Sequence, residues 1–261
     1  MGEAVVRESP PLMSPDGDSR VTERSAERSI SPVRAGLVYA AFTVHFVLLL
    51  VGLFPWLRDG LQLHPALCWF LTGYALFVPM AVLSILLTRR QGAVTGGEIA
   101  LALRLKPLGS RDWLTVIGGT ILVVLLTGAI ATLVKLLGPS LGVPPLKTTP
   151  WFLAFEPLQG AEQLLLIVWA GMFVFNILGE ELLWRGYLQS RMDARAGWMW
   201  GSAFWAVFHL PFGLNLLIIL LPVLVLLPYV VHRTGNTSVG VAIHALYNGP
   251  AFLLIALGVV R

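Results

Sequence analysis

Long apolar runs make up most of the chain, and short polar or basic segments separate them. The runs that predict helices cover residues 35–57, 65–88, 113–137, 161 to about 189, 196–210, 214–231 and 237–260. A helix needs about 20 apolar residues to cross a bilayer, so most of these runs are long enough, and 196–210 is short for an independent span. The pattern therefore predicts an all-α polytopic membrane protein, a helical bundle with about seven transmembrane helices.

The polar segments divide the predicted helices into groups. Residues 1–33 form a Ser- and Pro-containing tail of mixed charge, which we expect to be disordered because it cannot bury apolar surface. Residues 89–112 are a basic linker with a short amphipathic piece at 98–105, and 138–160 form a Gly/Pro-rich loop. We expect a tail at 1–33, membrane helices and linkers at 34–160, and a helical core that carries the chemistry at 161–261.

Composition agrees with a membrane location. Hydrophobic residues make up 56% of the 261 residues and charged residues 12%, against about 25% charged residues in a soluble domain. The net charge of +4 does not predict nucleic-acid binding, because the basic residues are spread over the loops. The single cysteine, Cys68, excludes an intramolecular disulfide. The predicted partners are the lipid bilayer and, if the protein is an enzyme, its substrate.

The distribution of Lys and Arg predicts the orientation, since cytoplasmic loops are rich in both. If the amino terminus is cytoplasmic, fourteen of the eighteen basic residues lie on the cytoplasmic side. Seven spans then place the carboxyl terminus outside, and the compact, Arg-rich chain suggests a bacterial plasma membrane. Glu180 and His244 would lie roughly 10–15 Å from the cytoplasmic ends of their helices.

Two adjacent carboxylates, Glu180 and Glu181, stand inside an apolar helical run. A charge in mid-bilayer costs at least ~3 kcal/mol, and charges within membrane helices usually mark function. Glu181 and Arg185 are four residues apart and share a helix face, so they can pair. Glu180 points away from that pair and is left for chemistry. The alternative is that both carboxylates are solvated charges at the membrane interface.

Two later predicted helices also carry polar side chains at membrane depth. His209 closes the run at 196–210, and His244 and Asn248 share one face of the last helix because they are four residues apart. The simplest way to accommodate these groups and the glutamates is one polar intramembrane cavity. A purely structural hydrogen-bond cluster would also satisfy them.

This set of groups suits hydrolysis. Glu180 and His209 could hold a water and remove its proton, while His244 and Asn248 could donate hydrogen bonds to an oxyanion. A catalytic zinc or other divalent metal held by Glu180, His209 and His244 is an open alternative, and no organic cofactor is expected. The chain has no His-Glu-x-x-His motif, its Gly17-Asp18 pair lies in the tail, and the residues around Ser202 do not fit a serine-protease motif.

The ordered motifs resemble the CAAX protease and bacteriocin-processing (CPBP, or Abi) family of intramembrane endopeptidases, which includes CAAX prenyl protease 2-like enzymes. The motifs are Glu180-Glu181-x-x-x-Arg185, an aromatic residue (Trp205) followed by x-x-x-His209, and His244-x-x-x-Asn248. The resemblance covers about residues 160–250. Trp205 stands where the family usually has Phe, which we expect to change the shape of the pocket more than its chemistry.

The resemblance implies a role for each of these polar residues. Glu180 would be the catalytic base and His209 would hold the water, while Glu181 and Arg185 would organise the site. His244 and Asn248 would stabilise the oxyanion. Family members are often classed as metalloproteases, and a glutamate mechanism without metal is argued for eukaryotic ones, so both remain open here.

Three functions follow as alternatives. The leading hypothesis is an intramembrane endopeptidase that cleaves a membrane-associated, prenyl-type or bacteriocin-like peptide. The second is a non-catalytic membrane scaffold or bacteriocin immunity protein that keeps the protease fold. The third is a small transporter, against which the missing inverted repeat speaks.

Overall fold

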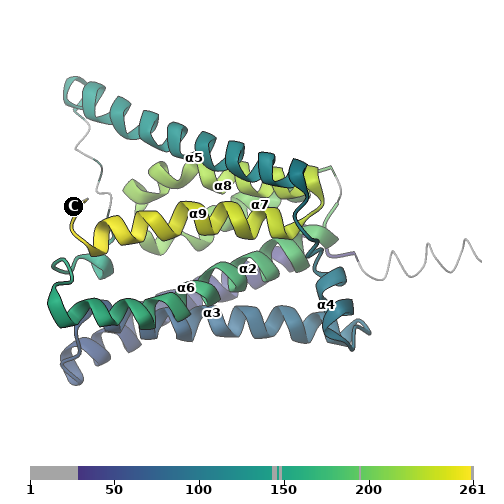
Figure 1. The fold of residues 1–261 in the computed structure, drawn as a ribbon, viewed down its shortest axis with the longest axis horizontal. Coiled ribbons are helices and arrows are strands. Elements are labelled where there is room, and N and C mark those ends of the chain that lie inside the picture. The colour runs from purple at the N-terminus through teal and green to yellow at the C-terminus, as the bar shows by residue number, and fades with distance from the viewer. Residues whose placement is uncertain (1–28, 143–145, 147–148, 194, 260–261) are drawn as a thin grey trace, which may run out of the picture.

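The computed structural model describes residues 29–142, 146, 149–193 and 195–259, so most of the predicted tail lies outside the described residues. Every regular element in these ranges is a helix (Figure 1), which confirms the predicted all-α class. The long helices are α2 (Pro32–Leu48), α3 (Pro65–Arg90), α5 (Ser110–Leu137), α6 (Leu165–Glu180), α7 (Gly197–Phe208), α8 (Leu214–Thr234) and α9 (Thr237–Ala256). The short pieces are η1 (Leu49–Leu53), η2 (Trp56–Gly60), α4 (Gly96–Ala102), η3 (Pro139–Leu141), η4 (Trp151–Leu153), η5 (Gly160–Leu164), η6 (Glu181–Leu188), η7 (Gln189–Arg191) and η8 (Leu210–Phe212).

Six helical segments in the described part of the chain are long and apolar enough to cross a membrane. They are Pro32–Gly60, Pro65–Arg90, Ser110–Leu137, Gly160–Arg191, Leu214–Thr234 and Thr237–Ala256. The outward faces of these segments are apolar, and α5 in particular exposes a long row of Leu, Ile and Val side chains. The chain is therefore an integral membrane protein whose surface contacts lipid.

The predicted count of seven spans is not confirmed, because α7 has 12 residues and a length of about 18 Å. Even so, α7 and η8 together connect the two ends of the bundle. Gly197 at the start of α7 lies against the end of the α6–η7 segment, at Gln189. Phe212 in η8 packs against Trp69, near the start of α3, and against Phe152.

Local sequence signals define several helix ends. Thr95 and Glu98 form a reciprocal capping box at the start of α4, so the predicted amphipathic piece is a helix over Gly96–Ala102. Asn236 caps the start of α9 through the backbone N–H of Ser238. Gly235 separates α8 from α9 in the left-handed conformation, at φ 57°, which glycine adopts at little cost.

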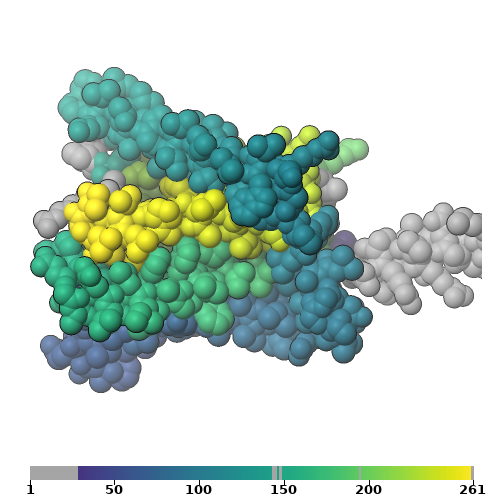
Figure 2. Space-filling view, in the orientation of Figure 1, coloured from purple at the N-terminus to yellow at the C-terminus, as the bar shows by residue number. Residues whose placement is uncertain are grey.

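The bundle packs helices from both halves of the sequence against each other. The α3 helix packs on α6, α2 on α7, and α5 on both α8 and α9. Gly179 allows the close approach of α6 to α3, since a Cβ there would lie 2.6 Å from the carbonyl oxygen of Phe77. The α9 helix lies on one face of the molecule between α5 and α6 (Figures 1 and 2). The division at residues 160 and 161 stays a prediction.

Candidate active site

Glu180 is the last residue of α6 and is 2% exposed. One carboxylate oxygen accepts a hydrogen bond from the amide of Asn176 at 3.0 Å, and the other accepts one from the indole N–H of Trp205 at 2.5 Å. A carboxylate has about four acceptor positions, so each oxygen keeps capacity for a further donor. The structure thus holds Glu180 in one orientation without using up its acceptor capacity.

Trp205 lies at the centre of the polar cluster. Its ring packs beneath the guanidinium of Arg185, with 3.5 Å between the guanidinium carbon and the ring centroid. The rings of His209 and His244 meet it edge to face, with centroids 5.2 and 5.6 Å away. Trp205 therefore contacts a member of each of the three sequence motifs, in addition to its hydrogen bond to Glu180.

Replacing Trp205 with Phe tests the indole hydrogen bond while keeping an aromatic ring. A hydrogen bond to a charged group is worth about 1.5–3 kcal/mol, so we expect W205F to lower kcat about 10- to 100-fold. KM should change little, because the lost contact orients Glu180 rather than the substrate. Steady-state kinetics on the purified variant measures both constants, and an unchanged kcat would contradict this role.

Glu181 is fully buried behind Glu180 and forms a charged group with residues from two helices. Its Oε1 lies 3.2 Å from Nη1 of Arg185 and 2.9 Å from Nδ1 of His244. The predicted pair between Glu181 and Arg185 is therefore present. The helix changes to a π-helix over Glu181–Leu188, a widened turn that occurs frequently at functional sites.

Gly240 on α9 makes room for the carboxylate of Glu181. A Cβ at this position would lie 2.6 Å from Oε2 of Glu181 and 2.7 Å from Cγ2 of Val231. We expect G240A to destabilise the protein by about 1–3 kcal/mol, as overpacking does, and to lower activity by displacing Glu181. Thermal unfolding in detergent measures the first effect. The matched control is G118A, where a Cβ meets no atom within 4 Å; equal behaviour of the two variants would refute the steric argument.

The other ring nitrogen of His244 contacts Asn248. Asn248 donates from its amide nitrogen to Nε2 of His244 at 2.9 Å, while Nδ1 of His244 donates to Glu181. In this neutral ring Nε2 is an acceptor, so the second N–H of Asn248 is the donor offered to the cavity. This arrangement leaves Asn248 as the donor that faces the cavity, whereas the sequence predicts two oxyanion donors, His244 and Asn248.

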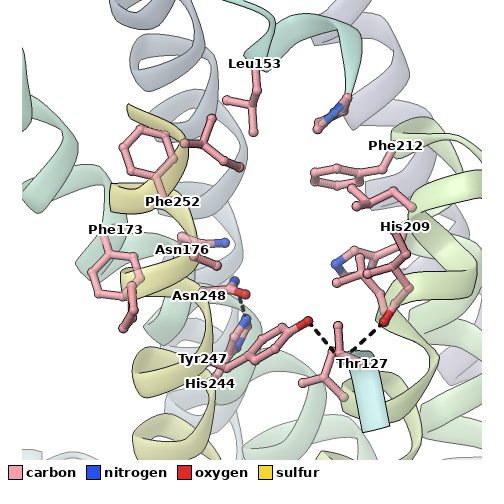
Figure 3. Close-up of a pocket in the computed structure, with 18 of the residues that line it drawn as sticks. Thr127, Leu153, Phe173, Asn176, His209, Phe212, His244, Tyr247, Asn248 and Phe252 are labelled. Carbon is pink, nitrogen blue, oxygen red and sulfur yellow. Dashed lines mark hydrogen bonds between the residues drawn. The ribbon is translucent and has the colours of Figure 1, made fainter. Parts of the chain in front are cut away.

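His209 follows the last residue of α7, and its ring is fixed by its own helix. Nδ1 donates to the carbonyl oxygen of Trp205 at 2.9 Å, so Nε2 carries a lone pair. Figure 3 shows the ring of His209 across the cavity from Asn176 and Asn248. His209 is thus placed to accept a hydrogen bond from a molecule inside the cavity.

These groups line one end of a cavity of about 750 Å³. Its polar lining residues are Thr127, Asn176, Glu180, His209, His244, Tyr247 and Asn248. Most of the remaining lining is apolar and comes from α3, α5, α6, α8 and α9. Figure 3 shows Phe173 and Phe252 on one side of the cavity and Phe212 on the other. A cavity of this size with a few convergent polar groups is typical of a binding or active site.

The structure brings together all six residues singled out from the sequence. Glu180, His209, His244 and Asn248 line the cavity, whereas Glu181 and Arg185 lie behind them. Sequence reasoning missed two donors to Glu180: the amide of Asn176 and the indole of Trp205. Asn176 stands one helical turn before Glu180, and that spacing was a usable signal.

The predicted metal ligands do not form a metal site in this arrangement. No group of three or more His, Cys, Asp or Glu side chains in the described part of the chain is arranged to hold a metal ion. Both ring nitrogens of His244 and both oxygens of Glu180 have protein partners, and of these three residues His209 alone keeps an unengaged nitrogen. No step of the chemistry below is therefore routed through a metal.

Comparison with known proteins places the site within a family. Residues 162–249 match the family model described as type II CAAX prenyl endopeptidase Rce1-like. Comparisons with curated proteins and with solved structures gave no match. The matched segment contains all six motif residues together with Asn176 and Trp205. The match over residues 162–249 confirms the resemblance to the CAAX protease family that the ordered motifs predict.

Proposed function

We propose that the protein is an intramembrane endopeptidase that hydrolyses a peptide bond in a membrane-anchored polypeptide. The observation that carries this proposal is the pair of acceptors facing one cavity, Glu180 and Nε2 of His209. A water that donates one hydrogen to each acceptor keeps its lone pairs free for attack on a carbonyl carbon. The family match supports proteolysis, and it does not favour the non-catalytic scaffold.

The reaction follows from the positions of the side chains. Glu180 removes a proton from the water as the water oxygen bonds to the carbonyl carbon. Asn248 donates an N–H to the oxyanion of the tetrahedral intermediate, and His244 holds the Asn248 amide in place. The C–N bond then breaks, and the proton on Glu180 passes to the leaving nitrogen, which regenerates the carboxylate.

Glu181 and Arg185 support this chemistry without contacting the substrate. Glu181 accepts from Nδ1 of His244, which fixes the tautomer that leaves Nε2 as an acceptor for Asn248. Arg185 compensates the charge of Glu181 in the apolar interior, where an isolated carboxylate would be costly. We therefore propose Glu180, His209 and Asn248 as the catalytic residues and Glu181, Arg185 and His244 as positioning residues.

Purified protein in liposomes tests the proposal directly. The probes are a panel of lipid-anchored peptides that includes a prenylated carboxyl-terminal tetrapeptide motif, and mass spectrometry detects new termini. We expect cleavage by the wild-type protein and its loss in H209A. Failure to cleave any lipid-anchored peptide, with the protein shown to be folded, would overturn the assignment.

Chelation distinguishes this mechanism from the metal alternative. Because Glu180 and His244 already have protein partners on both oxygens and both ring nitrogens, we expect cleavage to survive exhaustive treatment with EDTA or 1,10-phenanthroline. Added zinc should not increase the rate. A zinc peptidase treated in parallel is the positive control, and loss of cleavage that zinc restores would contradict the glutamate mechanism.

We also propose that the protein lies in a bacterial plasma membrane with its amino terminus in the cytoplasm. Basic residues in the described ranges gather at the end of the bundle where α4 lies, called here the basic end. They are Arg34, Arg89, Arg90, Arg104, Lys106, Arg111, Arg191, Arg195 and Arg233. The opposite end carries Arg58 and Lys135 in the same ranges, and by the positive-inside rule this asymmetry supports a cytoplasmic basic end.

A further inference from the structure

The cavity extends from the catalytic residues toward the end of the bundle opposite the basic end. On α5 it is lined by Val124, Thr127 and Gly128, in the half of the helix farther from the basic end. On α9 it is lined from His244 onward to Ile255, next to the last residue of the helix. Pro150 and Leu153, in the segment between α5 and α6, complete this end.

Toward the basic end of the bundle, the site is closed by a hydrogen-bonded cluster of Leu103, Arg104, Ser190 and Thr237, called here the Leu103 plug. Leu103 is 1% exposed, and its carbonyl oxygen accepts from the hydroxyl of Thr237 at 2.8 Å. The backbone N–H of Thr237 donates to the carbonyl of Arg104, and the Arg104 side chain donates to the carbonyl of Ser190. A Cβ on Gly186 would lie 3.0 Å from the carbonyl oxygen of Leu103, so η6 packs directly against the plug.

The helices α5 and α9 pack closely near the basic end, and farther along they are bridged by the hydrogen bond between the Thr127 and Tyr247 hydroxyls. At Gly119 of α5 a Cβ would lie 3.0 Å from Ile243 of α9, so the helices touch there. At Gly128, farther from the basic end, a Cβ would meet no atom within 4 Å. Figure 1 shows α5 diverging from α9 toward the end of the bundle where α9 ends.

Several residues of this wall both line the cavity and lie exposed on the surface. They are Val124 and Gly128 of α5 and Leu246, Pro250, Ala251 and Leu254 of α9. A residue with both properties marks a place where the cavity reaches the outside of the molecule. The cavity therefore has a lateral mouth between α5 and α9, in the half of the membrane away from the basic end.

We propose that the substrate enters from the extracytoplasmic side, as a membrane-anchored polypeptide whose scissile bond is presented at the outer leaflet. This rests on the proposed function and orientation, and it specifies the substrate as an exported peptide rather than a cytoplasmic one. The bond would pass between α5 and α9 and reach Glu180 from the side opposite the Leu103 plug.

Cysteine accessibility tests this direction of entry independently of catalysis. In a C68A background, T127C places a thiol inside the cavity, and T120C places one two turns closer to the basic end on the same face of α5. Thr127 lines the cavity, beside the hydroxyl of Tyr247 at 3.3 Å, and Thr120 does not line it. The exposed positions V94C and L141C report on the basic end and the opposite end.

A membrane-impermeant maleimide is applied to intact cells and to inverted membrane vesicles. We expect L141C and T127C to react in intact cells, V94C to react in inverted vesicles, and T120C to stay unlabelled in intact cells. Reaction of T127C from the side of V94C, or from neither side, would overturn the entry route. Reaction of L141C from the cytoplasmic side would overturn the orientation. Labelling as expected without any cleavage activity would leave the entry route standing and refute the proposed function.

Discussion

Replacing Glu180 with Gln is expected to lower the rate of peptide cleavage by about 100- to 10,000-fold, which is the usual contribution of a general base. Gln has nearly the same shape, and its one carbonyl oxygen can still accept from either Asn176 or Trp205, which donate to different oxygens of Glu180. It cannot take a proton from water. Single-turnover cleavage of a lipid-anchored peptide in liposomes measures the rate, and substrate binding should be little changed.

The matched control for E180Q is E156Q, because Glu156 is exposed and lies outside the cavity. E156Q should cleave at the wild-type rate. Retention of substantial activity in E180Q would mean that another group removes the proton, and His209 would then be the first residue to consider.

The largest loss of stability is expected at Glu181. Glu181 is fully buried, and E181Q leaves the guanidinium of Arg185 in the interior without its carboxylate. Breaking a buried ion pair by removing one partner costs about 3–5 kcal/mol. We therefore expect E181Q to reduce the free energy of unfolding by that amount in detergent, and to lose activity because the His244 ring loses its carboxylate acceptor.

The double variant E181Q/R185M separates charge from packing. Removing the cation as well should restore most of the lost stability, because no charge is then left buried and unpaired. Activity should not return, since His244 still lacks the carboxylate that fixes its tautomer. A double variant as unstable as E181Q would show that the loss comes from packing rather than from the unpaired charge.

Much of the site could be predicted from helical spacing. Glu181 with Arg185, and His244 with Asn248, are four residues apart, and both pairs are in contact in the structure. Burying polar groups in an apolar bundle is costly, which is why residues from three separate helices could be expected to converge. These arguments need only the sequence and the geometry of a helix.

The detailed geometry of the site could not be predicted in the same way. The sequence predicts Trp205 only as an aromatic shape, since nothing in it shows where an indole N–H points, yet the indole donates to Glu180. The π-helix that begins at Glu181 depends on packing against other elements, which no local pattern encodes. Likewise, helical spacing puts His244 and Asn248 side by side, but the hydrogen bond from Asn248 to Nε2 of His244 appears only when both side chains are placed.

The length of α7 and the direction in which the cavity extends also could not be predicted from the sequence. The apolar run at 196–210 predicts a helix, and η8 with Gly213 ends α7 early enough to leave the number of full spans at six in the described residues. The position of Glu180 and Glu181 along their helix predicts that they lie near its cytoplasmic end, which would favour access to the site from the cytoplasm. The plug around Leu103, formed by residues distant in sequence, instead fills that side of the site.

The most direct test of Glu180-dependent proteolysis is a comparison of peptide termini in membranes from cells that express the wild-type protein, E180Q or E156Q. Mass spectrometry of enriched termini identifies substrates even when their sequences are not known beforehand. We predict a set of new termini in membrane-anchored polypeptides that appears with the wild-type protein and E156Q and is absent with E180Q. The same termini in the E180Q sample, at equal protein levels, would contradict the account.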